Sequence, residues 1–344
     1  MSRATPEKNR LAVIAKKKDA NAALKRIVHL GVFDRSRKII KRQSHVEIPV
    51  IRSVSGCELV LQEDPLFYKK KLDLFHALQG KIPEECIHLI PRGWFLLGEV
   101  IVVKIHPDLT AYEHHIGQAL LDFYPRCCTV LADEGIFGPF REPVRRVIVG
   151  NKTQTVHKEN KVIFNLDASL VMFSPGNLME RIRMSRFGKG EYIVDMFAGI
   201  GYFTLPMAVH SRPRKIVAIE LNPNAYHYLC QNIRQNHVEE IVEPVLGDCA
   251  KVTPQGVADR VVMGMVQVTD QYLQKGISAL RPGGILHYHQ TIAASMYPAA
   301  AIRDVIEAAT SLGCRAEIQN CVLVKKYSPG VVHAVIDARI DRDF

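Results

Sequence analysis

The residues of this sequence best suited to chemistry are acidic side chains and glycines at the ends of short apolar stretches. The segment YIVDMFAGIG at 192–201 is an apolar strand that ends at Asp195 and turns at Gly199 and Gly201. Glycine permits a tight turn and a close approach of a ligand to the backbone. Thr204 occupies the third position of the dinucleotide-binding pattern G-x-G-x-x-G/A, and the Asp195 carboxylate would repel a pyrophosphate. The segment therefore predicts a binding loop for a positively charged ligand.

Two further carboxylates end the next two apolar stretches. Glu220 lies 19 positions after Gly201, where an acidic side chain accepts hydrogen bonds from both ribose hydroxyls. Asp248, within LGDC at 246–249, suits the amino group of an adenine. Simple capping of strand ends does not explain why Asp195, Glu220 and Asp248 follow one another in order. The sequence therefore predicts an S-adenosylmethionine site.

The elements that position these residues alternate between strands and helices from residue 190 onward. The expected strands are YIVD, KIVAIE, EPVLGD, RVVMG and GILHYH. This order predicts a doubly wound α/β sheet, which binds ligands at the carboxyl ends of its strands. Asn222 and Pro223 are typical of the N-cap and first position of a helix. We expect LRPGG at 280–284 to form a later turn of this class I methyltransferase-type, Rossmann-like fold, and Cys321–Lys325 and Val331–Ile340 to form a terminal hairpin.

Smaller α+β domains precede this region. We expect a basic module at 1–60, a middle domain at 70–170 and the Rossmann-like domain at 175–344. Apolar periodicity predicts helices at 19–30, 72–79 and 109–123, and strands at 46–51, 94–105 and 162–166. The stretch at 142–161 is polar and basic.

The charge of the chain favours a polyanionic partner. Lys and Arg total 45 against 35 Asp and Glu, a net charge of +10. Residues 1–50 hold 13 basic and four acidic side chains, an excess of 13 − 4 = +9. Such a cluster is typical of a nucleic-acid contact, and the alternative is a solvated basic face.

Composition excludes several classes of protein. With 47% hydrophobic and 23% charged residues, the chain is neither disordered nor collagen-like, and it has no apolar run long enough for a membrane span. No signal sequence is visible, so we expect a soluble, intracellular protein. None of the eight cysteines forms a C-x-x-C pair, so we expect no metal site and reduced, mostly buried thiols.

Four motifs carry a resemblance to a known family. They are TVHKE at 155–159, MFSPGN at 172–177, ERIRM at 180–184 and the DMFAGIG loop. This set resembles the archaeal and eukaryotic enzymes that modify the guanosine 3′ of the tRNA anticodon. The resemblance covers roughly Leu72 to the C-terminus, and the first module is similar to an N-terminal domain of the methyltransferase branch.

The family holds two activities, and the segment Gly264–Val266 separates them. One branch methylates N1 of guanine and has asparagine and proline here. The other transfers the 3-amino-3-carboxypropyl group of S-adenosylmethionine to 4-demethylwyosine at position 37 of tRNA(Phe), releasing methylthioadenosine. Gly264-Met265-Val266 and the later HYHQT at 287–291 resemble the second branch, which we favour. The methyltransferase remains the alternative. A tRNA-binding module without catalysis is a third hypothesis, against which the intact acids argue.

The resemblance implies a set of cofactor contacts. They are Ser174, Arg181, Phe197, Gly199, Glu220, Asp248 and Cys249. A guanidinium such as Arg181 can hold the methionine carboxylate bidentately. The alternatives are a phosphate contact for Arg181 and a helix N-cap for Ser174.

The resemblance also implies a partner and a compartment. The partner is the anticodon loop of tRNA(Phe), and the compartment is the cytoplasm. We expect Arg183 and Arg186 to face tRNA phosphate or solvent, and His287 and His289 to be hydrogen-bonded strand residues on one face. No residue is assigned as the proton acceptor, and the sequence does not indicate the oligomeric state.

Overall fold

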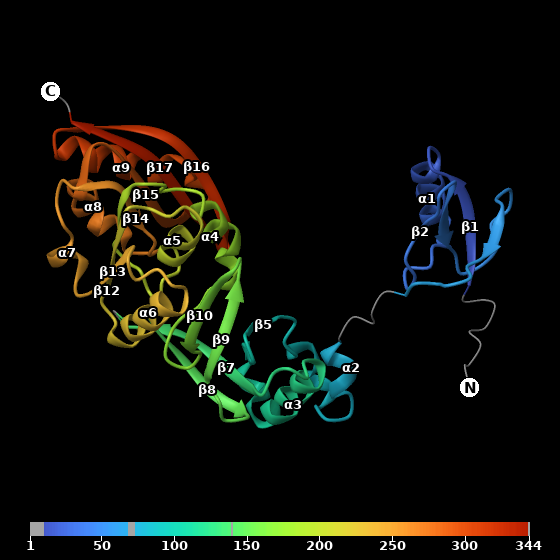
Figure 1. The fold of residues 1–344 in the computed structure, drawn as a ribbon. Coiled ribbons are helices and arrows are strands. Elements are labelled where there is room, and N and C mark those ends of the chain that lie inside the picture. The colour runs from blue at the N-terminus through green and yellow to red at the C-terminus, as the bar shows by residue number, and fades with distance from the viewer. Residues whose placement is uncertain (1–9, 68–72, 139, 343–344) are drawn as a thin grey trace. The chain divides into compact units, whose positions relative to one another are not determined.

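A computed structural model describes residues 10–67, 73–138 and 140–342 (Figure 1). The chain divides into two compact units, Met1–Asp73 and Leu74–Phe344. The second unit is the larger of the two.

The first unit is a four-stranded sheet, in the order β2-β3-β1-β4, with one helix. Its elements are β1 (Leu11–Lys16), α1 (Ala20–His29), β2 (Ile40–Lys41), β3 (His45–Pro49) and β4 (Leu59–Leu61). Ile27 of α1 packs with Val13 of β1 and Ile48 of β3 in a small apolar core. Arg37 is fully buried, because its guanidinium bonds Asp34 and the carbonyl oxygens of residues 11 and 50.

The second unit begins with a mixed sheet in the order β5-β6-β7-β8. Its elements are α2 (Leu74–Leu78), η2 (Glu84–Leu89), β5 (Trp94–Leu97), β6 (Val100–Val103), η3 (Pro107–Tyr112), α3 (Glu113–Phe123), β7 (Thr129–Phe137) and β8 (Glu142–Val149). The single strand predicted at 94–105 is wrong, because Gly98 adopts φ +54° and turns the chain into the β5–β6 hairpin. The basic stretch also holds strands: in β8 the side chains of Pro143 and Ile148 are buried, whereas those between them are exposed or half-buried.

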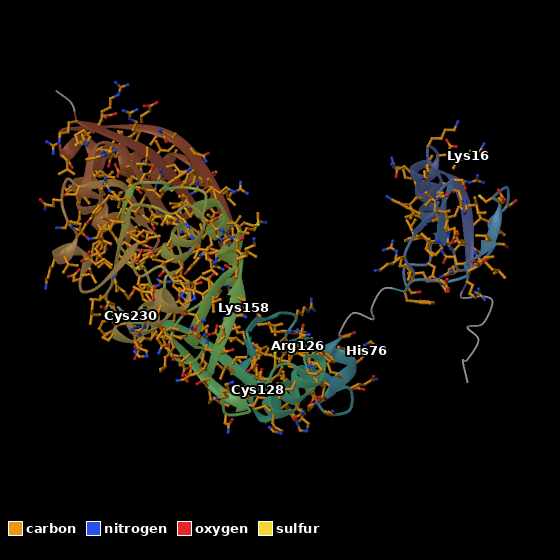
Figure 2. All side chains as sticks on the ribbon, in the orientation of Figure 1. Lys16, His76, Arg126, Cys128, Lys158 and Cys230 are labelled. Atoms are coloured by element: carbon orange, nitrogen blue, oxygen red, sulfur yellow. The ribbon has the colours of Figure 1, made fainter. Side chains whose placement is uncertain are left out.

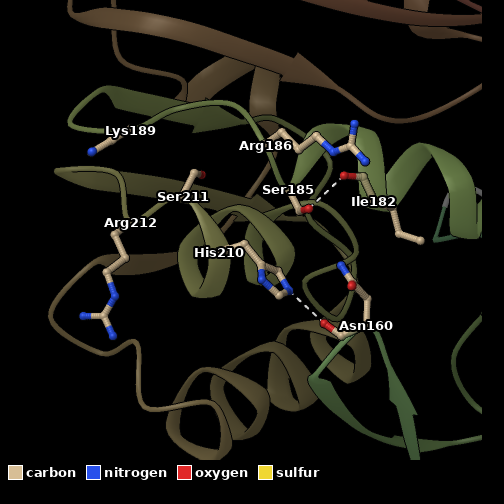
Figure 3. Close-up of a pocket in the computed structure, with 8 residues that line it drawn as sticks. All are labelled: Asn160, Ile182, Ser185, Arg186, Lys189, His210, Ser211 and Arg212. Carbon is tan, nitrogen blue, oxygen red and sulfur yellow. Dashed lines mark hydrogen bonds between the residues drawn. The ribbon is translucent and has the colours of Figure 1, made fainter.

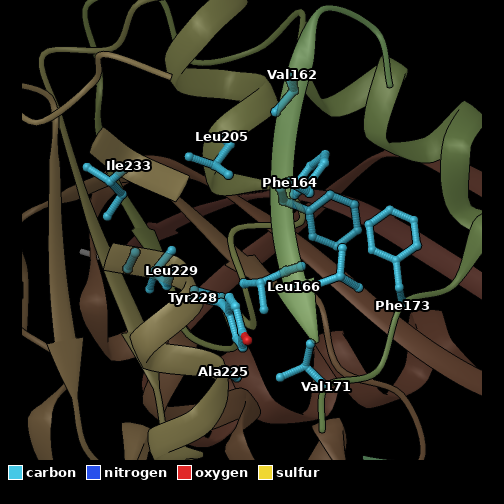
Figure 4. Packing of buried hydrophobic residues seen from close by; sticks show 14 of the residues in the cluster. Val162, Phe164, Leu166, Val171, Phe173, Leu205, Ala225, Tyr228, Leu229 and Ile233 are labelled. Atoms are coloured by element: carbon cyan, nitrogen blue, oxygen red, sulfur yellow. The ribbon is translucent and has the colours of Figure 1, made fainter. Parts of the chain in front are cut away.

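A second hairpin connects this sheet to the remainder of the unit. It consists of β9 (Gln154–Glu159) and β10 (Val162–Asp167). The fully buried Phe164 and its β10 neighbours belong to one apolar cluster with Leu205 and Leu229 (Figure 4). Leu205 lies on helix α5 (Thr204–His210) and Leu229 on helix α6 (Pro223–Gln235). Burial of each such side chain contributes about 1.5–3 kcal/mol. Asn232 and Asn236 also bond the β10 backbone at 2.7–3.1 Å.

The largest layer is a seven-stranded sheet in the order β13-β12-β11-β14-β15-β17-β16. Its strands are β11 (Tyr192–Asp195), β12 (Lys215–Glu220), β13 (Val242–Leu246), β14 (Ala258–Met263), β15 (Leu280–Ala293), β16 (Cys314–Ser328) and β17 (Val331–Arg342). All neighbouring pairs from β13 to β15 are parallel, whereas β17 is antiparallel to β15 and β16. The strand order reverses between β11 and β14, which is where open α/β sheets bind ligands.

The helices of this region precede, connect or follow the sheet strands. They are η4 (Pro175–Asn177), α4 (Leu178–Met184), α5 (Thr204–His210), α6 (Pro223–Gln235), α7 (Cys249–Val252), η5 (Thr269–Tyr272), α8 (Leu273–Ala279), η6 (Ala294–Met296) and α9 (Ala299–Ser311). Asn222 caps α6 through hydrogen bonds from the Asn224 and Ala225 backbone, as predicted. The predicted fold class and the terminal hairpin are confirmed. The LRPGG segment differs from expectation, since it forms the first residues of β15, with Gly283 at φ +79°.

The cysteines also differ from expectation. All eight are free, but only Cys249 is buried, Cys128 is exposed and the other six are half-buried. Figure 2 labels the exposed Cys128 and the half-buried Cys230. The eight cysteines lie inside helices and strands, at the first residues of such elements and in loops, and their spacing alone does not reveal burial. Among the described residues, no helix is both long and apolar enough to cross a membrane. In the same part of the chain, no three His, Cys, Asp or Glu side chains gather as a metal site would require.

Candidate functional site

A cavity of about 530 Å³ lies at the carboxyl edge of the large sheet. It is lined by the residues that follow β11, β12, β13 and β14, by Ser174 before α4, and by side chains of β16 and β17. Segments far apart in the sequence therefore converge at the strand-order reversal. Six of the seven predicted contact residues line this cavity; they are Ser174, Phe197, Gly199, Glu220, Asp248 and Cys249.

The loop after β11 depends on glycine. Gly199 adopts φ +59°, and a Cβ atom there would overlap the Tyr202 ring. Its amide donates a 2.7 Å hydrogen bond to Glu220 Oε2, while Glu220 Oε1 accepts from the Asn222 amide at 2.7 Å. The Glu220 carboxylate thus holds two cavity loops and keeps lone pairs for a ligand diol. Burial raises the pKa of Glu220, and these two amides oppose that shift.

The third acidic position ends β13. Asp248 is the N-cap of α7, where its Oδ1 accepts a 2.9 Å hydrogen bond from the Ala250 amide. Cys249 follows, and burial together with the nearby Asp248 raises the pKa of its thiol to about 12. A protonated thiol is a poor nucleophile, so Cys249 contributes shape and backbone to the cavity. The Gly199 loop, the Glu220 carboxylate and the Asp248–Cys249 segment together fit an adenosine-containing cofactor such as S-adenosylmethionine.

Asp195 lies beneath the loop. It is fully buried, its Oδ2 accepts a 2.7 Å hydrogen bond from the Thr204 hydroxyl, and Oδ1 accepts from the Phe197 amide at 3.3 Å. Burial raises its pKa to about 6. Asp195 is not among the cavity-lining residues, so the expectation that it faces a charged ligand gives way to a supporting role for the loop.

Arg181 is the predicted contact that does not line the cavity. Its guanidinium pairs with both oxygens of Glu159 and donates to the Ser174 carbonyl oxygen at 2.9 Å. Burial would raise the pKa of Glu159, but hydrogen bonds from His157 and Arg181 lower it to about 2. The positive charge of Arg181 is therefore neutralised by Glu159 of β9. The predicted contact of Arg181 with the cofactor stays a prediction.

Ser174 lies at the cavity wall, where Lys325 is its partner. It occupies the N-cap position of η4, but its hydroxyl makes no capping bond. Instead, Ser174 Oγ accepts a 2.8 Å hydrogen bond from Lys325 Nζ, which comes from β16. The N-cap alternative for the Ser174 side chain is therefore wrong.

The segment after β14 forms a lip without asparagine or proline. A Cβ atom at Gly264 would lie 2.7 Å from the Phe203 ring, so the ring fills the space of a side chain there. The lip is held by Gln290, whose Oε1 accepts from the Gln267 amide at 3.1 Å. The buried Thr269 also donates to the Met265 carbonyl oxygen at 2.5 Å. One hydrogen bond accepted by Gln290 of HYHQT and one between Thr269 and Met265 thus hold this segment in the absence of a proline ring.

A buried ionic network runs behind the cavity. Arg183 bonds Glu180 at 2.6 and 2.8 Å and Asp337 of β17 at 2.5 Å. Asp337 in turn accepts from His287 Nδ1 at 2.5 Å, and Arg260 lies 2.5 Å from His287 Nε2. The prediction that Arg183 faces phosphate or solvent is wrong, because Glu180 and Asp337 enclose it. The prediction for His287 as a hydrogen-bonded strand residue is confirmed.

A histidine pair connects this network to the cavity. His289 Nδ1 and His333 Nε2 lie 3.1 Å apart, and burial lowers both pKa values to about 3. Both rings are therefore neutral, and His333 lines the cavity. The sequence patterns did not indicate His333 or Lys325. A hairpin centred on Pro329 places Lys325 opposite His333, and this pairing could be predicted from the turn at 328–330. The sequence around each residue does not indicate that either one lines the cavity.

A second depression, of about 580 Å³, lies near the amino end of β11 (Figure 3). Its lining residues are Asn160, Ile182, Ser185, Arg186, Lys189, His210, Ser211 and Arg212. None of these eight is acidic, and Arg186, Lys189 and Arg212 are exposed. The prediction that Arg186 faces solvent or phosphate is consistent with this position.

Comparisons with known proteins agree with this architecture. Residues 155–318 match the family model described as TRM5/TYW2 methyltransferase domain, residues 74–153 match the TYW2 N-terminal domain, and residues 12–58 match the tRNA methyltransferase 5 N-terminal domain. A Methanocaldococcus jannaschii protein named tRNA(Phe) (4-demethylwyosine(37)-C(7)) aminocarboxypropyltransferase is 42% identical over 72% of this chain and 97% of its own.

Two solved structures are similar over most of their length. Pyrococcus horikoshii TYW2 in complex with MeSAdo has a TM-score of 0.69 and 33% identity, covering 78% of this chain and 98% of its own. Trm5b from Pyrococcus abyssi has a TM-score of 0.73 and 28% identity, covering 96% of this chain and 99% of its own. By sequence, domain order and fold, the chain belongs to the TRM5/TYW2 family.

Proposed function

We propose that this protein transfers the 3-amino-3-carboxypropyl group of S-adenosylmethionine to C7 of 4-demethylwyosine at position 37 of tRNA(Phe). The reaction belongs to wyosine-derivative biosynthesis and releases methylthioadenosine. The observation that carries the proposal is the lip Gly264–Val266, which lacks a side-chain amide beside the base and is held by Gln290 instead. A Methanocaldococcus jannaschii relative at 42% identity is named for the same transfer.

The residues of the cavity bind and orient both reactants. When bound, S-adenosylmethionine supplies an electrophilic methionine Cγ; the base carbon forms a bond to it while the C–S bond breaks and its electrons pass to sulfur. Glu220 and the Gly199 loop hold the adenosine end in place. Positioning of this kind accounts for roughly 7–11 kcal/mol of a barrier. The ring proton leaves after the C–C bond has formed, so no strong base is required beforehand.

The alternative activity is methylation of guanine N1 in the same tRNA position. Relatives named for it share the first unit, since Trm5b from Pyrococcus abyssi is similar over 96% of this chain. The Gly264 lip argues against that activity, because Gly264, Met265 and Val266 carry neither a side-chain amide nor a proline ring. A tRNA-binding module without catalysis is disfavoured by the intact Gly199–Glu220 hydrogen bond.

The product of the reaction tests the proposal. Incubation with S-adenosylmethionine and tRNA(Phe) carrying 4-demethylwyosine should add the mass of one aminocarboxypropyl group to that nucleoside. Methylthioadenosine should appear in equal amount, both read by mass spectrometry of the digested tRNA and the supernatant. Formation of S-adenosylhomocysteine with methylated guanosine would assign the alternative activity instead.

The first unit serves tRNA affinity in this proposal. Lys16 ends β1 and Lys17 and Lys18 follow it directly; all three are exposed and have no ion-pair partner among the described residues. Arg37, in contrast, is buried against Asp34 and is not available to RNA. The exposed cations provide a polyelectrolyte contact whose strength falls with salt.

Glutamine substitution of these three lysines gives a measurable consequence. We expect weaker tRNA binding and a log-affinity against log-salt slope that is smaller by about one for each phosphate that the variant no longer neutralises. Cofactor affinity and the free energy of unfolding should stay unchanged, which serves as the control. An unaltered salt slope would make this cluster a solvated surface.

Each domain has a place in this proposed function. The module at 1–60 contacts tRNA, and the Rossmann-like domain at 175–344 binds the cofactor. The domain at 70–170 lies between these two domains in the sequence. The anticodon loop is the part of tRNA that reaches the cavity, since it carries the modified base. In this proposal the protein modifies tRNA in the cytoplasm.

A further inference from the structure

Lys325 is a cavity cation that takes no part in holding the adenosine end of the cofactor. It lies on β16, directly opposite His333 of β17, and both side chains line the cofactor cavity. Its ammonium donates to Ser174 Oγ at 2.8 Å, and its side chain packs within 3.2–3.3 Å of where a Cβ atom would lie at Gly176. The ammonium is therefore held at a fixed place on the wall.

This ammonium lacks an acidic partner among the described residues. Its neighbours are the Ser174 hydroxyl and the positive charge of Arg181, and burial together with Arg181 lowers its pKa. The neighbouring His333 is neutral and adds no negative charge. A partly buried cation without a counter-charge is costly unless a ligand supplies an anion.

The other charged groups near the cavity have partners or face other parts of a ligand. Both oxygens of Glu159 neutralise Arg181. Arg141 also lines the cavity, but its guanidinium donates to the Gln267 side-chain oxygen, next to the lip, at 3.3 Å. Glu220 organises the loop expected to hold the ribose. Lys325 is thus the cation best placed for an anionic group on the aminocarboxypropyl side.

We propose that Lys325, together with Ser174, binds the carboxylate of the aminocarboxypropyl group and thereby orients the methionine Cγ toward the base. This inference rests on the proposed function, since it names the carboxylate holder for the same transfer. Lys325 is a specificity-determining residue in this scheme, because the position of the carboxylate decides which carbon of the sulfonium faces the nucleophile. The role that sequence assigned to Arg181 then falls to Lys325, and Arg181 holds the Ser174 backbone.

Calorimetry with three ligands isolates the carboxylate contact. S-adenosylmethionine carries the carboxylate, decarboxylated S-adenosylmethionine lacks only that group, and methylthioadenosine lacks the whole side chain. Lys325→Met should weaken S-adenosylmethionine binding by about ten- to a hundred-fold, as expected when a charge-assisted hydrogen bond is removed. Affinity for the other two ligands should stay within about two-fold, and Lys325→Arg should restore part of the loss.

The matched control is Lys326→Met. Lys326 is the next residue on β16 and does not line the cavity. The substitution removes the same charge from the same strand, so its three affinities should equal those of the wild type. Equal losses for all three ligands in Lys325→Met, or a loss of tRNA affinity alone, would overturn the inference. A wild-type protein that binds neither S-adenosylmethionine nor methylthioadenosine would instead overturn the proposed function.

Discussion

Replacement of Glu220 by Gln should reduce the affinity for S-adenosylmethionine by about one to two decades. The ribose diol then loses charge-assisted hydrogen bonds worth roughly 1.5–3 kcal/mol. The side-chain NH₂ group of the glutamine would also face the backbone N–H of Gly199 or of Asn222. Both of these N–H groups donate hydrogen bonds to the Glu220 carboxylate. Isothermal titration calorimetry measures this loss directly.

The loss should be the same for methylthioadenosine, because that ligand keeps the ribose. This result separates Glu220 from Lys325, whose substitution affects only ligands with a carboxylate. Glu243→Gln on the adjacent strand β13 is the matched control, since Glu243 pairs with Lys215 at the surface. Unchanged calorimetric affinity in Glu220→Gln would remove this carboxylate from the site.

Replacement of Asp337 by Asn should lower the free energy of unfolding by about 3–5 kcal/mol. Asp337 is 5% exposed and accepts from Arg183 and His287 at 2.5 Å each. Removal of its charge leaves the half-buried Arg183 with a single counter-ion, and breaking a buried pair costs about that much. Denaturant-induced unfolding measures the change as a shift of the midpoint.

The effect of Asp337 depends on pH in a defined direction. Burial alone would raise the pKa of Asp337, but His287 and Arg183 hold it well below its usual range. A depressed pKa stabilises the folded state above the unfolded pKa of about 3.9, and that stability is lost as the pH falls further. The gap between wild type and variant should therefore narrow below about pH 4.

Asp341→Asn provides the control for this network. Asp341 lies on the same strand β17, and its pair with Arg339 is exposed, with side-chain exposures of 44% and 48%. Exposed pairs contribute about 0–1 kcal/mol, so this variant should unfold near the wild-type midpoint. A comparable loss of unfolding free energy in both variants would mean that β17 tolerates no amide substitution. The buried network would then not be the cause of the loss in Asp337→Asn.

Local sequence patterns were sufficient to predict the part of the site that lies at the ends of strands. Gly199, Glu220 and Asp248 each follow a short apolar run, and parallel strands bring such ends to one edge. The same patterns do not reveal burial, so Asp195 was expected to face a ligand although Thr204 encloses it. The side-chain pairing that covers Asp195 depends on the pitch of the following helix, which spacing alone does not specify.

Contacts between distant segments account for what the sequence patterns did not indicate. Arg183 and Asp337 are 154 positions apart, so no pattern near Arg183 indicates its burial. Lys325 meets Ser174 across 151 positions. The strand predicted at 94–105 failed for a local reason, because its apolar run does not show the positive φ of Gly98. Long-range pairing thus supplied Lys325 of the cavity wall and the ion pair between Arg183 and Asp337.

The contact between Gly264 and Phe203 constrains how this lip can evolve. Any side chain at 264 would meet the Phe203 ring at 2.7 Å, and that ring also packs against His289 at 4.9 Å. A mutational path toward an asparagine at 264 must therefore change the ring first, or pass through a strained ancestor. The two substitutions are coupled, since a side chain at 264 is strained while the Phe203 ring keeps its position. An asparagine at 264 and the present position of the Phe203 ring therefore exclude each other in this fold.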